Sequence, residues 1–176
     1  MTNNINDSDI VITSAFRTPI GSFLGSLSEF TAVDLGTEVI KKCIEHSKLN
    51  TNEVDMVYMG QTIEHIMPEF LPGVLEWIGD HLAHNGKFIF DTPNRLITAI
   101  QSDAFIDPDH KIEYTPNELR DILHSCNFSI SDSWGLLPMP KTFKLKKFSP
   151  QEVYDHALVS NELEISYLFA FSCERN

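Results

Sequence analysis

The stretch VDMVYMGQTIEHI, residues 54–66, decides the fold. Its first six residues form an apolar run of strand length, and a polar tail with Gln61, Glu64 and His65 follows. Open α/β sheets bind their ligands just beyond the carboxyl ends of their strands, so these three residues are candidate ligand-binding residues. The alternative interpretation is that they are loop residues that make only local hydrogen bonds.

The residues upstream predict a strand, helix, strand unit. The β-branched run IVITS at residues 10–14 predicts the first strand. Thr31 is suited to cap a helix whose third residue is Asp34, and that helix should end within residues 46–50. With residues 54–59 as the second strand, the crossover should be right-handed and the two strands parallel.

Downstream of the opening stretch, two more helices are predicted. Pro68 suits the first turn of the first one, which carries an apolar stripe at helical spacing. Thr115 and Glu118 form the ends of a capping box that begins the second. Strands are expected at residues 87–91, 128–134 and 164–172, whereas residues 96–113 are expected to be irregular.

Four polar residues in the downstream half are candidate site residues. Thr92 and Asn94 follow the strand at 87–91 and could face an acceptor substrate, although TPN is also a good turn sequence. Asp109 and His110 could act together as a base that deprotonates an acceptor hydroxyl. The alternative interpretation is that DPDH is simply a turn.

Composition excludes several classes of partner. The chain has 176 residues, with 13 basic and 25 acidic residues and a net charge of -12, which predicts no binding to nucleic acid or anionic membranes. We expect a small-molecule substrate if the chain is active. Because no apolar run reaches about 18 residues and MTNNINDSD lacks the apolar core of a signal peptide, we expect a cytoplasmic protein.

Cysteines and histidines give no sign of a disulfide framework or a metal site. Cys43, Cys126 and Cys173 have no CxxC spacing and stand in apolar stretches, which is typical of reduced, buried thiols. Among the seven histidines, His81 and His84 lie one helical turn apart, but the local sequence offers no third ligand. The sequence therefore predicts no metal.

Residues 8–60 resemble the beginning of the thiolase family, the acetyl-CoA acetyltransferases. The resemblance rests on RTPIGSFLG, on the helix opening AVDLG, and on the closing VDMVYMG. Thiolases use a nucleophilic cysteine with a histidine and a second cysteine, all in later parts of the family's chain. Cys43 is no substitute, because it lies on the inward face of a helix, where a thiol is ordinarily inert.

Residues 55–176 resemble the C-terminal half of class I S-adenosylmethionine-dependent methyltransferases. The resemblance rests on GQTIEHI, on GKFIFDTPNR, on HKIEYTPNELRDIL and on SYLFAFSCER. It implies S-adenosylmethionine as cofactor, with residues 61, 64 and 65 bordering it. The family binds the cofactor with a Gly-rich turn, however, and no two of the eight glycines make G-x-G, so the sequence lacks the motif on which that binding depends.

Together these patterns predict one α/β unit with a shared strand. We expect a single three-layer, mixed, mostly parallel sheet with helices on both faces, in which the thiolase-like segment, residues 1–60, completes the methyltransferase-like half, residues 55–176. The expected strand order is 10–14, 54–60, 87–91, 164–172, 128–134, and the strand at 164–172 is antiparallel.

Three functional interpretations stay open. The first is a fusion of transferase fragments without a complete active site. The second is a methyltransferase with a rebuilt cofactor pocket. The third is an acyl-CoA-related role, as a thiolase-like acetyltransferase or as a binder of thiolase subunits.

Overall fold

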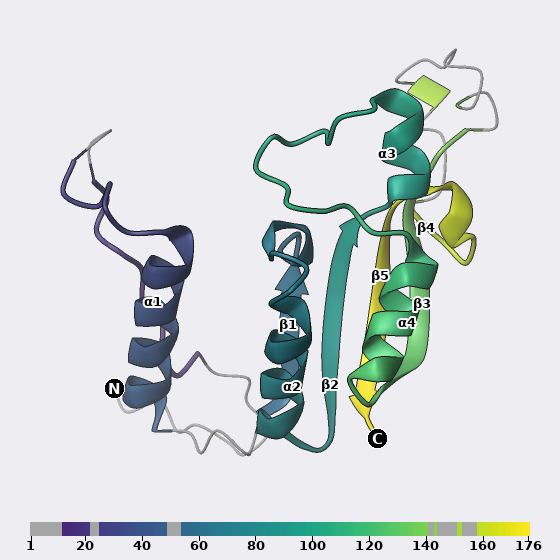
Figure 1. The fold of residues 1–176 in the computed structure, drawn as a ribbon. Helices are drawn as coiled ribbons and strands as arrows, with labels where there is room; N and C mark the ends of the chain where they lie inside the picture. The colour runs from purple at the N-terminus through teal and green to yellow at the C-terminus, as the bar shows by residue number, and fades with distance from the viewer. Residues whose placement is uncertain (1–11, 22–24, 49–53, 141–142, 144–150, 153–157) are drawn as a thin grey trace, which may run out of the picture. The chain divides into compact units, whose positions relative to one another are not determined.

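The computed structural model describes residues 12–21, 25–48, 54–140, 143, 151–152 and 158–176. Two compact units divide the chain, Met1–Thr51 and Asn52–Asn176, so the strand in the opening stretch belongs to the second unit (Figure 1). That the two form one globular unit stays a prediction. Among the described residues, no helix is both long and apolar enough to cross a lipid bilayer.

The first unit is built on helix α1 (Ala32–Ser47), which begins as predicted. The Thr31 hydroxyl accepts a hydrogen bond from the backbone N–H of Asp34 at 3.2 Å, and the Asp34 carboxylate accepts one from the Thr31 N–H at 2.9 Å. This reciprocal pair satisfies two of the donors that a helix start leaves free. None of the described side chains of this unit is buried.

The predicted strand at residues 10–14 is not part of the sheet that the structure describes. Residues 10 and 11 lie outside the described part of the chain, and residues 12–14 have no strand structure. The order of the described strands begins with β1 (Val54–Gly60), whose partner in that order is β2 (Leu82–Pro93). The strand prediction is therefore wrong for residues 12–14, because β-branched composition favours extended backbone but tertiary context decides whether a strand forms. The pairing of residues 10–14 with β1 stays a prediction.

The sheet of the second unit has the order β1-β2-β5-β3-β4. Its other strands are β2 (Leu82–Pro93), β3 (Phe128–Pro138), β4 (Val159–Ser160) and β5 (Ser166–Arg175). The predicted order of β1, β2, β5 and β3 is confirmed, and the two-residue β4 was not predicted. Only β1 and β2 pair in parallel among the described strands, so the sheet is mixed, as predicted, but its pairings are mostly antiparallel.

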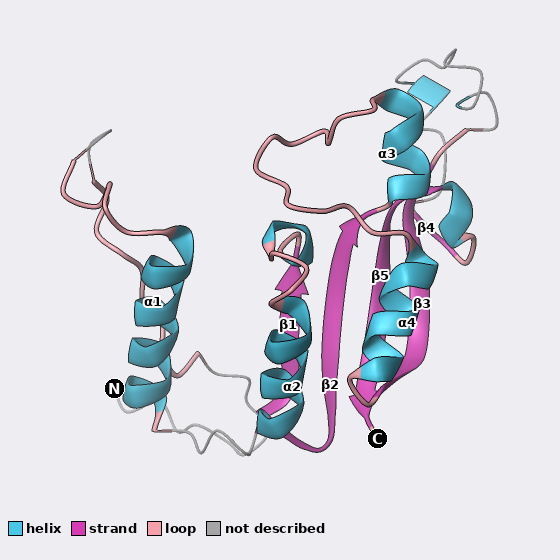
Figure 2. Ribbon diagram, in the orientation of Figure 1, coloured by secondary structure: helices cyan, strands magenta, loops and turns pink. Residues whose placement is uncertain are grey.

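Helices α2 (Leu71–His81) and α4 (Pro116–Ser125) cover the same face of this sheet (Figure 2). Alternate residues of the strands point toward them and close a core rich in phenylalanine. The buried members of this core include Leu71, Leu75, Ile78, Phe88, Phe90, Leu119, Leu123, Phe128, Phe169 and Phe171. The described elements therefore give one helical layer on the sheet, whereas the sequence predicts two.

Both helix starts in this region depend on local chemistry. Helix α4 has the predicted capping box of Thr115 and Glu118. Helix α2 begins three residues after Pro68, because residues 68–70 form a turn that the Phe70 N–H closes on the Met67 carbonyl at 2.9 Å. Pro72 occupies the first turn instead.

One helix was not predicted. Helix α3 (Arg95–Gln101) lies in the segment that the sequence predicts to be irregular. Asn94 caps it, since its side-chain oxygen accepts a hydrogen bond from the Leu96 N–H at 3.1 Å. The sequence TPN therefore begins a helix at the carboxyl end of β2.

Candidate functional site

A cluster of titratable side chains lies beyond the carboxyl ends of β1 and β2, with Glu64 at its centre. Glu64 belongs to a short 3-10 helix, η2 (Ile63–His65), that follows β1. Its side chain is 0% exposed, and one carboxylate oxygen, Oε2, accepts a hydrogen bond from the Thr92 hydroxyl at 2.9 Å. The other oxygen, Oε1, is buried and has no hydrogen-bond partner among the described residues.

The backbone of Glu64 also fixes a distant part of the chain beside it. Its carbonyl oxygen accepts hydrogen bonds from the N–H groups of Lys111 at 2.8 Å and Ile112 at 3.2 Å. This junction brings His110 next to His65, and their rings meet edge to face with centroids 4.9 Å apart. Two histidines that are far apart in the sequence thus converge on one carboxylate.

His110 is oriented by a buried carboxylate, that of Glu113. The Nδ1 atom of His110 lies 2.9 Å from Oε1 of Glu113, and the His110 side chain is only 8% exposed. The same Glu113 oxygen accepts from the Ile106 N–H at 3.2 Å, while Oε2 accepts from the Thr98 hydroxyl and from Arg95 at 3.4 Å. Contact through Nδ1 leaves Nε2 of His110 available.

These contacts determine the charge of Glu113. Burial alone would raise the pKa of the Glu113 carboxyl, but hydrogen bonds from Thr98, His110 and the Ile106 N–H, together with the charge of His110, hold that pKa below its ordinary value. Glu113 is therefore an anion near neutral pH, and it favours an N–H on the Nδ1 atom of His110.

Three side chains of the cluster bring one possible ligand atom each close together. Glu64, His65 and His110 each offer one atom, and these atoms all lie within 4.8 Å of one another. A carboxylate beside two imidazoles can accept or donate protons, and the same three groups are common metal ligands. Of the predicted site residues, Glu64, His65, Thr92 and His110 come together here.

Gln61 has a different partner, Asp91. Its backbone is in the left-handed region, with φ 48°, and its side-chain amide donates to Asp91 Oδ2. The hydroxyl of Tyr58 donates to Asp91 Oδ1 at 2.6 Å, and this hydrogen bond and the charge of Asp91 raise the pKa of Tyr58. These contacts tie the end of β1 to β2.

Besides Gln61, two predicted site residues lie outside the cluster. Asn94 is 0% exposed, and its side-chain N–H groups donate to the carbonyls of Leu163 at 2.8 Å and Ser166 at 2.9 Å, so its contacts are structural. Asp109 is exposed in the predicted turn, and its N–H donates to the Asp107 side chain at 2.8 Å. The acidic partner of His110 is Glu113 and not Asp109.

Sequence reasoning missed Glu113 and Asp91. A signal for Glu113 is its spacing of three residues from His110 in HKIE, which allows a local side-chain contact. Asp91 lies at the end of a buried strand, where an unpartnered carboxylate is costly, so a partner on the neighbouring strand was to be expected. The partners of Asp91 cannot be identified without the register of β1 and β2.

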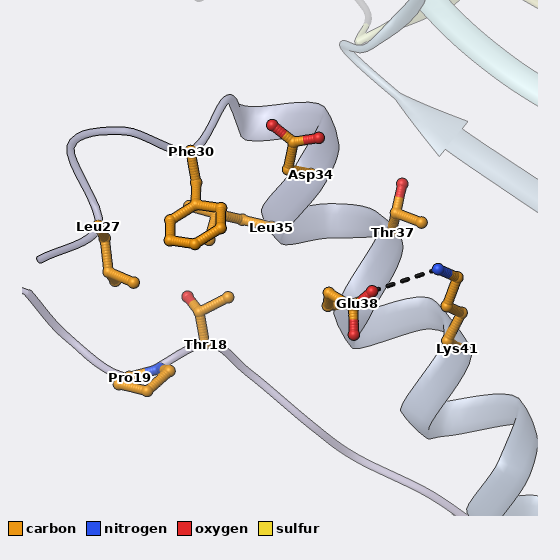
Figure 3. Close-up of a pocket in the computed structure, with 9 residues that line it drawn as sticks. All are labelled: Thr18, Pro19, Leu27, Phe30, Asp34, Leu35, Thr37, Glu38 and Lys41. Carbon is orange, nitrogen blue, oxygen red and sulfur yellow. Dashed lines mark hydrogen bonds and ion pairs between the residues drawn. The ribbon is translucent and has the colours of Figure 1, made fainter.

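The first unit contains a separate open groove of about 640 Å3 between the loop that precedes α1 and the helix itself (Figure 3). Its apolar part is formed by Pro19, Leu27, Phe30 and Leu35. Its polar part includes Asp34 and Glu38 and the lysine that pairs with Glu38 at 3.2 Å. Two acids against one base make the groove a poor site for a polyanion such as coenzyme A.

Comparison with known proteins relates the first part of the chain to the thiolases in sequence. A family model described as the N-terminal domain of thiolase matches residues 10–70. The acetyl-CoA acetyltransferase of Escherichia coli K12 is 52% identical over 54 residues, which are 31% of this chain and 14% of that enzyme. The mitochondrial enzyme of Rattus norvegicus is 54% identical over 56 residues, or 32% of this chain and 13% of that enzyme. The chain thus spans about a seventh of the curated relatives that it matches.

The fold is similar to that of a different class of protein. A crystal structure of an S-adenosylmethionine-dependent methyltransferase from Archaeoglobus fulgidus superposes with a TM-score of 0.51 at 21% sequence identity, and it covers 78% of this chain and 72% of that one. At this identity the likeness concerns the fold alone. The chain is therefore similar in sequence to the start of thiolases and similar in fold to a methyltransferase, as a chimera of the two would be.

Proposed function

We propose that these 176 residues are a fusion of two transferase fragments that lacks a complete active site of either kind. The observation that carries this proposal is the position of β1. In the described sheet β1 is the terminal strand, and residues 12–14 have no strand structure. The cofactor-binding turn of a Rossmann-like fold follows a strand in that part of the sheet.

The residues at the carboxyl end of β1 do not fit S-adenosylmethionine in the way that the fold family binds it. No two glycines of the chain make G-x-G, so no turn of that type is available for close backbone approach. Space beside Gly60 is already occupied, since a Cβ there would lie 3.0 Å from the Tyr58 ring and 3.3 Å from Asp91. Tyr58 and Gln61 both donate hydrogen bonds to Asp91 there.

The chain also lacks a cysteine in the environment that thiolase catalysis requires. Thiolase catalysis needs a reactive thiolate, and thiols become thiolates beside cations or at helix N-termini. Cys43 lies near the C-terminal end of α1, whereas burial raises the pKa of Cys173 to about 12. Cys173 is therefore unsuited to act as a nucleophile near neutral pH, and Cys43 does not lie at a helix N-terminus.

Mass spectrometry and a product assay test the proposal. After incubation of the full chain with acetyl-CoA, we expect no acetyl adduct on any of the three cysteines. After incubation with S-adenosylmethionine and mixed small-molecule acceptors, we expect no S-adenosylhomocysteine above the level without protein. An acetylated cysteine, or formation of S-adenosylhomocysteine that depends on the protein, would overturn it.

One observation favours the second candidate, a methyltransferase with a rebuilt pocket. The cluster of Glu64, His65 and His110 lies at the sheet edge where open α/β folds bind ligands, and it includes a buried carboxylate oxygen without a partner. Such a cluster could deprotonate a small acceptor. The net charge of -12 argues against a nucleic-acid acceptor or an anionic membrane partner.

A further inference from the structure

We propose that Glu64, His65 and His110 bind a divalent transition-metal ion, with Zn2+ as the preferred occupant. The sequence predicts no metal, because only His81 and His84 have a ligand-like spacing. The fold forms a different set, in which one carboxylate and two imidazoles place their donor atoms within 4.8 Å of one another. This proposal is independent of whether S-adenosylmethionine binds.

The state of Glu64 is the strongest argument. Its side chain is fully buried, yet Oε1 makes no hydrogen bond with any described residue, while Oε2 is held by Thr92 at 2.9 Å. Buried carboxylates are ordinarily paired with a charge or bound to a metal. A cation bound to Oε1 would supply the missing partner without disturbing the bond to Thr92.

His110 shows the arrangement that histidine ligands usually have. Its Nδ1 atom contacts the Glu113 carboxylate at 2.9 Å, and Glu113 is held in turn by Arg95 and Thr98. A ligating histidine commonly donates its other N–H to a carboxylate, which fixes the ring and makes the ligating nitrogen more basic. Nε2 of His110 is then the metal-binding atom.

The separation of the donors requires a small adjustment. Ligands of a tetrahedral zinc, each about 2.1 Å from the ion, are about 3.4 Å apart. The donor atoms here lie within 4.8 Å, so the site closes by movements of about 1 Å. Thr92 holds the Glu64 side chain and Glu113 holds that of His110, whereas the exposed His65 can rotate toward them.

The donor chemistry selects the kind of ion. Two imidazoles and one carboxylate suit Zn2+ and neighbouring transition metals better than Ca2+ or Mg2+, which prefer all-oxygen sites with more ligands. Three protein ligands leave a fourth position open to water or a small ligand, which is typical of catalytic and not of structural zinc sites. The exposure of His65 places that open position toward solvent.

Titration of the full chain with metal tests the proposal. After dialysis against a chelator, isothermal titration with Zn2+ should give one ion bound per chain. Co2+ should give visible d–d bands without a strong thiolate charge-transfer band, because none of the proposed ligands is a cysteine. Absence of binding, or a thiolate band, would overturn the assignment.

Variants then identify the ligands. His65→Asn changes an exposed side chain and should leave the circular dichroism spectrum unchanged while it weakens Zn2+ binding at least about tenfold. Glu64→Gln and His110→Asn should do the same, and the positioning variant Glu113→Gln should weaken binding by about 10- to 100-fold. His124→Asn, on the exposed side of α4, is the matched control and should bind as the wild type does.

A measurement on the wild type covers the case in which a buried variant fails to fold. On addition of Zn2+, the imidazole proton resonances of two histidines should shift, and His65→Asn should remove one of them. Shifts confined to other histidines, or equal affinity in His65→Asn and the wild type, would show that the ion binds elsewhere and would refute the site.

Discussion

The imidazole of His110 and the carboxylate of Glu113 are in contact, with Nδ1 and Oε1 2.9 Å apart. This pair connects the fold to the candidate site, because Glu113 is also bound by α3 while His110 reaches the cluster around Glu64. Loss of the Glu113 charge should therefore change both stability and ligand binding.

Glu113→Gln should lower the free energy of unfolding by about 1–3 kcal/mol, since a neutral amide cannot satisfy four donors that now bind a buried carboxylate. Urea denaturation followed by circular dichroism measures the change. Glu69→Gln, at an exposed position, is the matched control and should change stability by less than about 0.5 kcal/mol. Equal stability of both variants and the wild type would contradict the buried network.

The same carboxylate predicts a pH dependence. The pKa of Glu113 in the folded chain lies below its ordinary value of 4.5, so the unfolded chain binds more protons in the window below that value. Its stabilising contribution is therefore complete above about pH 4.5 and is lost as the pH falls through the folded pKa. The difference in unfolding free energy between the wild type and Glu113→Gln should shrink from pH 6 to pH 3. A difference that grows on acidification would contradict this sign.

Asn94→Ala should destabilise the second unit by about 2–3 kcal/mol. The change removes the cap of α3, at about 1 kcal/mol, and leaves two buried carbonyls without their donors. Thermal unfolding measures the loss. Asn117→Ala, at an exposed position in α4, is the control and should be nearly neutral. A neutral Asn94→Ala variant would indicate that the side chain is free for a ligand instead.

Gly135→Ala should also destabilise the chain, by about 1–3 kcal/mol, because of overpacking. A Cβ at Gly135 in β3 would lie 2.8 Å from the Cβ of Ser166 and 2.9 Å from the carbonyl of Glu162, so the strand would have to shift. Gly73→Ala is the control, since a Cβ there meets nothing within 4 Å and alanine favours the helix. Chemical denaturation should give a lower free energy of unfolding than the wild type for Gly135→Ala and a higher one for Gly73→Ala.

The sequence predicted the parts of the fold that depend on local chemistry. The capping boxes at Thr31 and Thr115 are formed by residues three positions apart, and both are confirmed. The missed helix α3 also has a local signal, the cap at Asn94, in a sequence for which the substrate-facing and turn interpretations were both left open. Whether an apolar run forms a strand depends on distant residues, and the expected strand at residues 10–14 is accordingly absent from residues 12–14.

The candidate site was predicted only in pieces. Glu64 and His65 were identified by their place after a strand, and His110 by its ability to act as a base. Their convergence depends on the hydrogen bonds from Lys111 and Ile112 to the Glu64 carbonyl, which no sequence pattern reveals. For the same reason the sequence suggested Asp109, the neighbour in the chain, as the partner of His110.

The core of the second unit predicts that this unit folds alone. All described buried side chains lie at or after Ile63. A chain of residues 52–176 should therefore keep the amide resonances of β2, β3 and β5 and unfold with a midpoint close to that of the full chain. A collapsed or unfolded spectrum would show that the thiolase-like segment completes the core.

Equilibrium dialysis of the full chain against radiolabelled S-adenosylmethionine tests the central claim most directly. The account predicts no retention of label by the protein at millimolar ligand, because the edge that should hold the cofactor lacks a glycine turn and is occupied by Tyr58, Gln61 and Asp91. Saturable binding of one equivalent, displaced by S-adenosylhomocysteine, would contradict it and would establish a rebuilt cofactor pocket.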